Sequence, residues 1–173
     1  MGEFVRLNSG GRARIRPIRP DDASRIQAAY GRLSPEAQYQ RFLTIKTRLS
    51  SEELRYLTDV DGERHFALVA CPADEPDRIV AVARFVQAGE DPGAAEFAIV
   101  VGDEFQGEGL GSALLARLAD AARERGFDRF TAIMLADNGP AHHLVDRLAG
   151  AVAHAHHSGP VDELEIDLVA WCG

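Results

Sequence analysis

Three alternating glycines form the part of the chain whose residue types and spacing most directly suggest chemistry. They are Gly107, Gly109 and Gly111 in the heptapeptide QGEGLGS, residues 106–112, which lies between an apolar run and a long amphipathic pattern. Glycine lets the main chain approach an anion closely, and the N-terminus of a helix carries a positive partial charge. The turn therefore predicts a ligand that contains phosphate.

Two familiar phosphate-binding loops fit this turn poorly. A Walker A loop needs GxxxxGK followed by Ser or Thr, because its lysine contacts the β- and γ-phosphates, and Lys46 is the only lysine of the chain. A dinucleotide-binding turn needs GxGxxG, but counting from Gly109 and Gly111 puts the third glycine position at Leu114. Asp137 could still serve as the ribose-binding acid, so a dinucleotide remains a weak alternative.

The elements that position this turn are predicted from periodicity and from turn residues. A strand and three short helices come first, followed by three strands, a helix, a strand, a second helix and two closing strands. In chain order the segments are GRARIRPIRP; PDDASRIQAAYGRL, LSPEAQYQRFL and LSSEELRYLT; HFALVAC, RIVAVARFVQ and AAEFAIVV; residues 109–125; FDRFTAIML; DNGPAHHLVDRLAG; and AVAHAHH with ELEIDLVAW. This order predicts an α+β (mixed α/β) fold with a central, mostly antiparallel, twisted sheet flanked by helices. We expect residues 1–173 to form a single domain.

Several local features carry more detailed predictions. Asp21 or Asp22 is expected to cap the first helix, and Asn138 is expected to cap the helix of the segment DNGPAHHLVDRLAG. The continuous apolar run FDRFTAIML predicts a central strand buried on both faces. The long helix is expected to present a leucine stripe to the core and to end at Gly126. Its stripe consists of Leu110, Leu114, Leu115 and Leu118.

Composition and charge limit the function classes. The formal charge is -8, which disfavours nucleic-acid binding and leaves the arginines of GRARIR as an exposed strand face. Cys71 and Cys172 give neither a disulfide framework nor a metal-binding spacing, and fit a reducing cytoplasm. The apolar runs are too short to span a bilayer, and no signal sequence is evident. We expect a cytoplasmic protein that binds neither nucleic acid nor membrane.

The pattern Gln106-x-x-Gly109-x-Gly111 follows a predicted strand and opens a predicted helix. In this setting it resembles the acetyl-CoA motif of the GNAT superfamily of N-acetyltransferases. The order of elements is also similar to that superfamily's, apart from an extra helix early in the chain. The resemblance implies acetyl-CoA as co-substrate, with its pyrophosphate in a nest of main-chain N–H groups. It assigns the cofactor to Ile99, Val100, Val101, Gln106, Gly107, Glu108, Gly109, Leu110, Gly111, Ser112, Asn138 and Ala141.

Three further segments, RIRPIRPDDA, RLSPEAQYQRF and LSSEELRYLTDVD, resemble the catalytic domain of bacterial Pat-type protein-lysine acetyltransferases. That resemblance implies a protein lysine as the acceptor and places the catalytic glutamate at Glu96. A primary amine must lose a proton before it attacks, and the thioester oxygen needs a hydrogen-bond donor. We therefore expect Glu96 as general base and the Val101 N–H as oxyanion donor. The tyrosine found in many GNAT enzymes is replaced here by Val145, as is common in the Pat-type branch.

The surroundings of Glu96 are expected to be apolar, which would make its carboxylate a better base. The alternative for this residue is a solvated charge at the start of the strand. Other hypotheses for the chain are an acyl-CoA-binding sensor without turnover and an acetyltransferase for a small-molecule amine.

The C-terminal histidines His154, His156 and His157 suggest a metal site, but the sequence supplies no nearby Cys, Asp or Glu to complete a ligand set. We therefore expect no metal. His65 precedes a strand and is expected to face the acceptor groove. The sequence gives no indication of the oligomeric state.

Overall fold

The computed structural model describes residues 2–42, 46–148 and 153–171. Within these ranges the strands are β1 (Glu3–Arg6), β2 (Arg12–Pro17), β3 (His65–Pro72), β4 (Ala81–Gln87), β5 (Ala94–Val101), β6 (Arg129–Leu135), β7 (Ala153–Ser158) and β8 (Val161–Asp167). The α-helices are α1 (Ala23–Arg32), α2 (Pro35–Phe42), α3 (Ser51–Thr58), α4 (Leu110–Glu124) and α5 (Gly139–Leu148). Two short 3-10 turns, η1 (Pro20–Asp22) and η2 (Asp103–Phe105), complete the elements of the described ranges.

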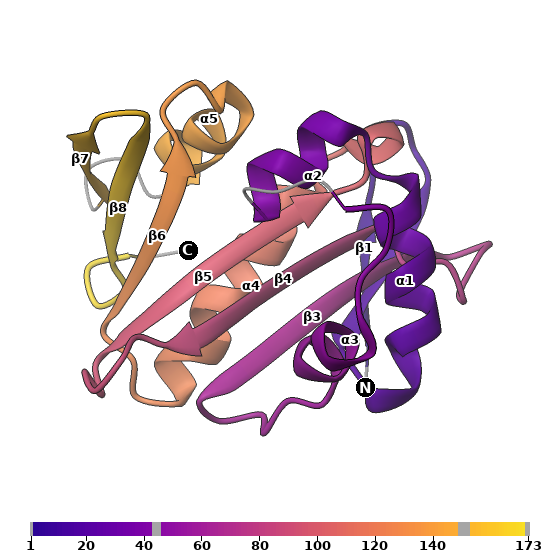
Figure 1. Ribbon diagram of the computed structural model, residues 1–173, viewed down its shortest axis with the longest axis horizontal. Coiled ribbons are helices and arrows are strands. Elements are labelled where there is room, and N and C mark those ends of the chain that lie inside the picture. The colour runs from indigo at the N-terminus through magenta and orange to yellow at the C-terminus, as the bar shows by residue number, and fades with distance from the viewer. Residues whose placement is uncertain (1, 43–45, 149–152, 172–173) are drawn as a thin grey trace.

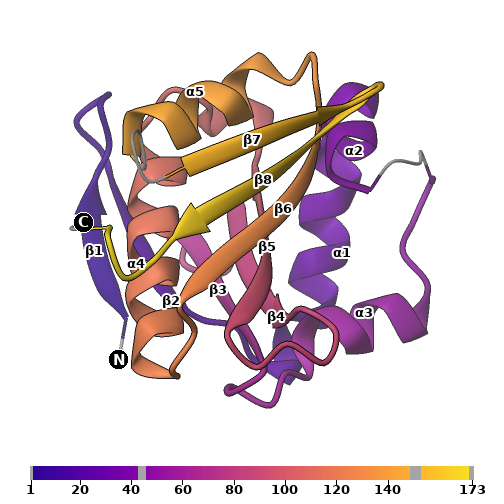
Figure 2. The same ribbon diagram turned by 90° about the vertical axis from the view of Figure 1, so that its left-hand side faces the viewer.

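The eight strands of these ranges form one sheet in the order β1-β2-β3-β4-β5-β6-β8-β7. Each neighbouring pair is antiparallel except β5 and β6, which are parallel. Helices α1 and α4 lie on opposite faces of this sheet (Figures 1 and 2). The predicted α+β fold with a mostly antiparallel sheet flanked by helices is confirmed.

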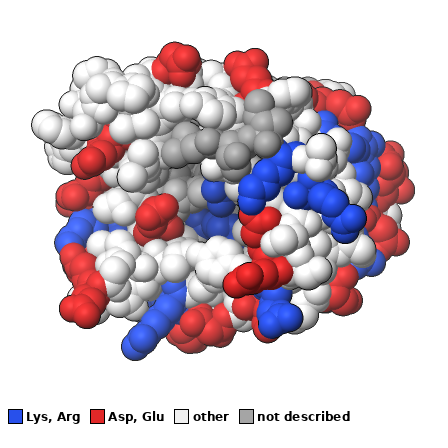
Figure 3. All heavy atoms as spheres, in the orientation of Figure 1, with Lys and Arg blue, Asp and Glu red and all other residues white. Residues whose placement is uncertain are grey.

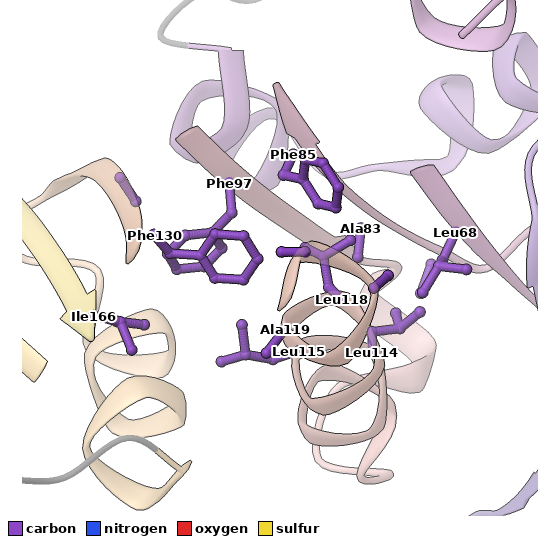
Figure 4. Close-up of a cluster of buried hydrophobic side chains, with 14 of the residues drawn as sticks. Leu68, Ala83, Phe85, Phe97, Leu114, Leu115, Leu118, Ala119, Phe130 and Ile166 are labelled. Atoms are coloured by element: carbon purple, nitrogen blue, oxygen red, sulfur yellow. The ribbon is translucent and has the colours of Figure 1, made fainter. Parts of the chain in front are cut away.

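Helix α4 packs on one face of the sheet through the predicted leucine stripe. Leu114, Leu115 and Leu118 are fully buried against Phe85 of β4 and Phe130 of β6, as Figure 4 shows. The helix ends before Gly126, whose φ of 84° lies in the left-handed region that favours glycine. Both the helix and its end point agree with the prediction.

The opposite face of β3 and β4 is covered by α1, α2 and α3. Ile26 and Tyr30 of α1 and Leu57 of α3 are buried there against Val69 and Ile79. These three helices cover only part of this face, because the strands from β6 onward lie beyond their reach (Figure 1).

The uncovered half of the sheet explains why the prediction for β6 is wrong. Phe130, Ala132 and Met134 are buried on the α4 side, but Ile133 points to the other face and is 61% exposed. An apolar strand run shows that a strand exists, but it does not show how far the covering helices extend. Strand β6 is therefore buried on one face and not on both.

The N-terminal strand β1 is a further difference from the predicted order. It pairs with β2 over Glu3–Arg6, and the turn between the two strands is closed by a 2.9 Å bond from the Leu7 N–H to the Gly11 carbonyl. Only Val5 of the strand packs against the core, while the other strand residues are exposed. Such a short segment carries no apolar alternation that would reveal it.

The predicted cap of α1 is also corrected. Asp22 occupies the N-cap position as predicted, but its side chain accepts no capping bond from the main-chain N–H groups of the helix and only a 3.3 Å bond from the Arg25 side chain. Its buried carboxylate accepts two hydrogen bonds from Arg16, of 2.7 and 2.8 Å, and one of 3.0 Å from the Arg19 N–H. The arginine row of β2 is thus not simply an exposed face, because Arg16 ties this strand to the start of α1.

Candidate active site

A gap opens between strands β5 and β6. Strand β5 pairs with β4 as far as Val101, but it pairs with β6 only over Ala94–Glu96. From there β6 turns away and continues beside β8, as Figure 1 shows. The last residues of β5 therefore have one strand edge without a neighbouring strand.

The main-chain N–H of Val101 faces this gap. The N–H of the next residue, Gly102, donates a 2.8 Å bond to the Val80 carbonyl at the start of β4. Because successive N–H groups of a strand alternate between its two edges, those of Val101 and Ile99 point to the β6 side. The predicted oxyanion donor is thus a strand N–H without a partner strand on its side.

The glycine turn lies at the end of this gap and leads into α4. Gly107 and Gly109 have φ values of 78° and 85°, and Gly109 is the N-cap of α4. Both values lie in the region where a side chain is disfavoured, which explains glycine at these two positions. The first N–H groups of α4, at Leu110 and the residues after it, have no partner within the helix and can bind an anion.

Gly111 serves a different purpose from the other two glycines. A Cβ on this residue would lie 3.3 Å from Cδ2 of Leu144 on α5. The absence of a side chain therefore lets the start of α4 approach α5 closely. Ser112 adds a second contact between the two helices, because its hydroxyl oxygen accepts a 2.6 Å bond from Arg147.

Helix α5 brings the remaining predicted cofactor residues to the site. The Asn138 side-chain oxygen accepts a 3.2 Å bond from the Ala141 N–H, so the predicted cap is confirmed. Ala141 and Leu144 pack against the core cluster under α4, and Val145 is buried. The aliphatic side chain at position 145 has no proton to give to a leaving thiolate.

Glu96 lies on the opposite face of β5 from Phe97, toward α1–α3, together with Ala98 and Val100. Its side chain is exposed, so the expected apolar enclosure is wrong. The cause is the same limited reach of the helices that exposes Ile133 on β6. The large apolar neighbour Phe97 points away from Glu96, to the α4 side.

A cavity of about 190 Å³ lies on this face; it is lined by Ala98 and Val100, which share the face of β5 with Glu96, but not by Glu96 itself. It is lined by residues of α1–α3, of the β4 region and of the end of β5, among them Tyr30, Arg41, Leu57, Arg84 and Val100. The walls are mostly apolar, apart from a few charged groups. Two of these charged groups, Arg41 and Arg84, lie outside the glycine motif and are not among the site residues predicted from the sequence.

Arg84 is buried in the middle of β4 and is 5% exposed. Its guanidinium lies 3.0 Å from His65 Nε2 and donates a 3.1 Å bond to the Leu57 carbonyl. Burial, and then the charge of Arg84, lower the pKa of His65 to about 4. The imidazole is therefore neutral near pH 7 and accepts the hydrogen bond from Arg84. His65 itself does not line the cavity, so its position facing the acceptor groove stays a prediction.

Sequence reasoning misses Asn8 as well as the two arginines. The side chain of Asn8, in the turn between β1 and β2, donates a 2.7 Å bond to the Gly107 carbonyl. Arg84 could have been found by the signal that identified Glu96, because each is a single charged residue within an apolar run; for Arg84 the run is IVAVARFV. Asn8 has no such signal, because asparagine is common in turns.

The C-terminal histidines lie near one aspartate, contrary to the expectation. Asp162 Oδ1 is 2.7 Å from His157 Nδ1, and Oδ2 is 3.2 Å from His142 Nε2. His154 and His156 are exposed on β7. In the described part of the chain, no three such side chains are grouped as metal ligands would be. Nor does any helix there have the length and apolar character needed to cross a membrane.

Comparison with known proteins adds independent findings. Residues 30–151, more than half of the chain, match the model of the acetyltransferase (GNAT) family. The chain is 36% identical over 148 residues to acetyltransferase Pat of Mycolicibacterium smegmatis. That alignment covers 86% of the chain and 44% of the relative, so the chain spans less than half of that protein's length.

Two solved structures resemble the fold. The crystal structure of the GNAT domain of S. lividans PAT matches with a TM-score of 0.87 and 32% identity, covering 96% of both chains. The structure of yncA, a putative acetyltransferase from Salmonella typhimurium with its cofactor acetyl-CoA, has a TM-score of 0.71. It is 19% identical and covers 93% of this chain and 96% of its own, so it bears on the fold alone.

Proposed function

Since the chain belongs to the GNAT family of acetyltransferases, we propose that it transfers an acetyl group from acetyl-CoA to a primary amine of a protein lysine. The observation that carries the proposal is the gap between β5 and β6, which runs from Glu96 to the glycine turn at the start of α4. Such a gap offers strand N–H groups and a helix N-terminus to one extended ligand that ends in phosphates.

The proposed cofactor site uses these main-chain groups. The turn from Gln106 to Ser112 would hold the pyrophosphate, because Gly107 and Gly109 have no side chain to obstruct it and α4 begins there. Residues Ile99–Val101 would bind the pantetheine arm along the open edge of β5, and Asn138 with Ala141 would flank it from α5. Acetyl-CoA, when bound, supplies the acetyl thioester. Membership of the acetyltransferase (GNAT) family supports this choice of cofactor.

The chain's own residues have two tasks in the reaction. Glu96 accepts the proton of the acceptor amine, directly or through water, and its exposed position on β5 leaves it accessible to that amine. The Val101 N–H donates a hydrogen bond to the carbonyl oxygen as negative charge develops there. The amine then attacks directly, and no covalent enzyme intermediate is required.

The protein lysine as acceptor is supported by the resemblance of the N-terminal segments to Pat-type domains and by the two Pat matches. A small-molecule amine is the alternative acceptor. We further propose that the chain acts as one N-acetyltransferase domain, supported by the continuous sheet of its described residues. A cytoplasmic location is proposed on the cysteines, of which Cys71 is buried and unpaired.

The proposal is tested by measuring thiol release from acetyl-CoA with a panel of lysine peptides and small amines. In Glu96→Gln, we expect a loss of about 100-fold or more in turnover with little change in coenzyme A affinity. Glu90→Gln, which removes an exposed carboxylate from the loop between β4 and β5, is the matched control.

Other outcomes of this experiment support other functions. If the wild-type protein binds coenzyme A but releases thiol with no amine, it is an acyl-CoA sensor and the proposal fails. If NAD stabilises the protein against heat and coenzyme A does not, it is a dinucleotide binder. If Glu96→Gln turns over normally, the base has been assigned to the wrong residue.

A further inference from the structure

Arg84 is a buried cation whose partners are both neutral. One is the imidazole of His65, at 3.0 Å, and the other is the main-chain carbonyl of Leu57, at 3.1 Å. No Asp or Glu in the described ranges forms an ion pair with Arg84. Buried charges in proteins are normally paired with an opposite charge, and a guanidinium has five N–H donors. The protein therefore holds a buried positive charge without a compensating carboxylate.

Arg41 lines the same cavity and places its positive charge near Arg84. Of the other two lining arginines, Arg32 donates to the Ile79 carbonyl and Arg78 is paired with Glu75 and Glu104. Arg41 lies in the last turn of α2 and is half-buried, with its guanidinium carbon 4.8 Å from the ring centre of Phe42. Burial, and then the charge of Arg41, lower the pKa of Arg84 to about 9, which is still above neutral pH. Guanidinium groups stay protonated in proteins, so Arg41 is a cation as well. Two guanidinium groups close enough to repel one another favour an anion between or beside them.

Glu96 compensates this charge only in part. It lies near enough to Arg41 to counter the lowering of that arginine's pKa by burial. Its own side chain is exposed, so it does not fill the cavity. Figure 3 shows basic side chains at the hollow in the centre of this face, with acidic side chains around it. Most of the cavity wall is apolar, which strengthens any charge pair formed inside it.

We propose that Arg41 and Arg84 form an anion subsite for a carboxylate that the acceptor carries close to its reactive amine. This inference rests on the proposed acetyl transfer at the same site. The cavity volume of about 190 Å³ is sufficient for a group of this size. With the amine at Glu96 and the carboxylate at the arginines, the site selects acceptors that carry both charges. Purely cationic amines are disfavoured.

The carboxylate can come from two parts of an acceptor, and assays with matched substrates distinguish them. It can belong to an acidic residue next to the lysine of a peptide, or it can be the α-carboxylate of a small amino acid. The first source predicts that acetyl-Gly-Glu-Lys-Gly-amide is a better substrate than acetyl-Gly-Gln-Lys-Gly-amide by about tenfold in kcat/KM, as for a charge-assisted hydrogen bond. The second predicts the same preference for lysine over lysinamide.

Arg41→Gln is the variant that tests the subsite. It removes one charge from the cavity at a half-buried position, and the preference for the acidic acceptor should fall to about twofold or less if this charge recognises it. Arg55→Gln removes an exposed arginine of α3 that does not line the cavity, and the preference should remain. Arg84→Gln, checked for folding by circular dichroism, provides a second variant with the same expected result.

A binding measurement tests the subsite without turnover. Succinate should raise the melting temperature of the wild-type protein and of Arg55→Gln above that in sodium chloride of equal ionic strength, but should not do so in Arg41→Gln. Equal use of the acidic and neutral acceptors would overturn the subsite while leaving acetyl transfer intact. If no amine is acetylated, the proposed function fails, and the succinate experiment alone decides the subsite. An equal succinate effect in all three proteins would overturn it.

Discussion

The side-chain amide of Asn8 donates a 2.7 Å hydrogen bond to the carbonyl oxygen of Gly107, which lies 99 residues further along the chain. The main-chain N–H of Asn8 also donates to the Glu108 carbonyl, at 3.3 Å. In a planar trans peptide the carbonyl and the following N–H point in opposite directions. Holding the Glu108 carbonyl on the Asn8 side therefore directs the Gly109 N–H to the other side, where an anion can approach it.

Asn8→Ala should weaken coenzyme A binding without unfolding the protein. The asparagine is exposed, so its removal leaves no cavity in the core. The loss of one hydrogen bond that orients the turn should reduce affinity by about three- to tenfold, measured by isothermal titration calorimetry. Arg6→Gln, which changes an exposed residue of the same hairpin, is the control and should bind normally. Unchanged affinity in Asn8→Ala would show that the turn keeps its geometry unaided.

Gly109→Ala should reduce both stability and coenzyme A affinity. At a φ of 85° a Cβ costs about 1–2 kcal/mol of folding free energy, and the new methyl group would lie 3.8 Å from the Asn8 side chain. Urea unfolding measures the first effect and calorimetry the second. Gly62→Ala introduces a similar strain at a φ of 79°, with no atom within 4 Å. It should lose stability but keep its affinity, so an equal loss of affinity in both variants would contradict the prediction.

The elements that position the glycine turn can be predicted from sequence because each has a strong local signal. The leucine stripe predicts α4, and the glycine that follows it predicts the end of that helix. Asn138 caps α5 as expected. In each case the signal and the structure depend on residues within a few positions of one another.

Features that depend on distant parts of the chain are the ones that sequence reasoning misses. The exposure of Glu96 and Ile133 depends on how far three helices of the N-terminal half extend over the sheet. Asn8 reaches the glycine turn only because β1 and β2 form a hairpin at its side. Arg84 becomes part of a cavity only when α2 and α3 pack over β4. No local sequence pattern reveals these contacts, because each joins segments that are far apart in the chain.

Asp22→Asn should destabilise the protein markedly. Burial alone would raise the pKa of Asp22, but the hydrogen bonds from Arg16 and from the Arg19 N–H outweigh it and leave the pKa below 3.8. The ionised group thus contributes stability that is present above the unfolded-state pKa and is lost as the pH falls through the folded-state value. Removing this charge beside Arg16 should cost about 3 kcal/mol near pH 7, measured by urea unfolding.

Asp21→Asn is the matched control for this change. Asp21 is exposed and precedes Asp22 directly, and its replacement should alter stability by no more than about 0.5 kcal/mol. Similar losses in the two variants would mean that the ion pair with Arg16 is not what stabilises the start of α1.

His65 predicts how stability depends on pH in the mildly acidic range. Burial, followed by the charge of Arg84, lowers its folded-state pKa to about 4 from 6.5. Between these values the unfolded chain binds a proton that the folded protein does not, so folding stability falls as the pH falls from 6.5 to 4. The contribution of this one group has a slope of up to about 1.4 kcal/mol per pH unit. In His65→Gln, the folding stability measured by urea unfolding should therefore fall less steeply as the pH falls over this range.

His143→Gln, at an exposed position of α5, is the control and should keep the wild-type slope. If His65→Gln also keeps it, the imidazole must become protonated in the folded protein despite Arg84, and the neutral hydrogen bond between these residues would be wrong.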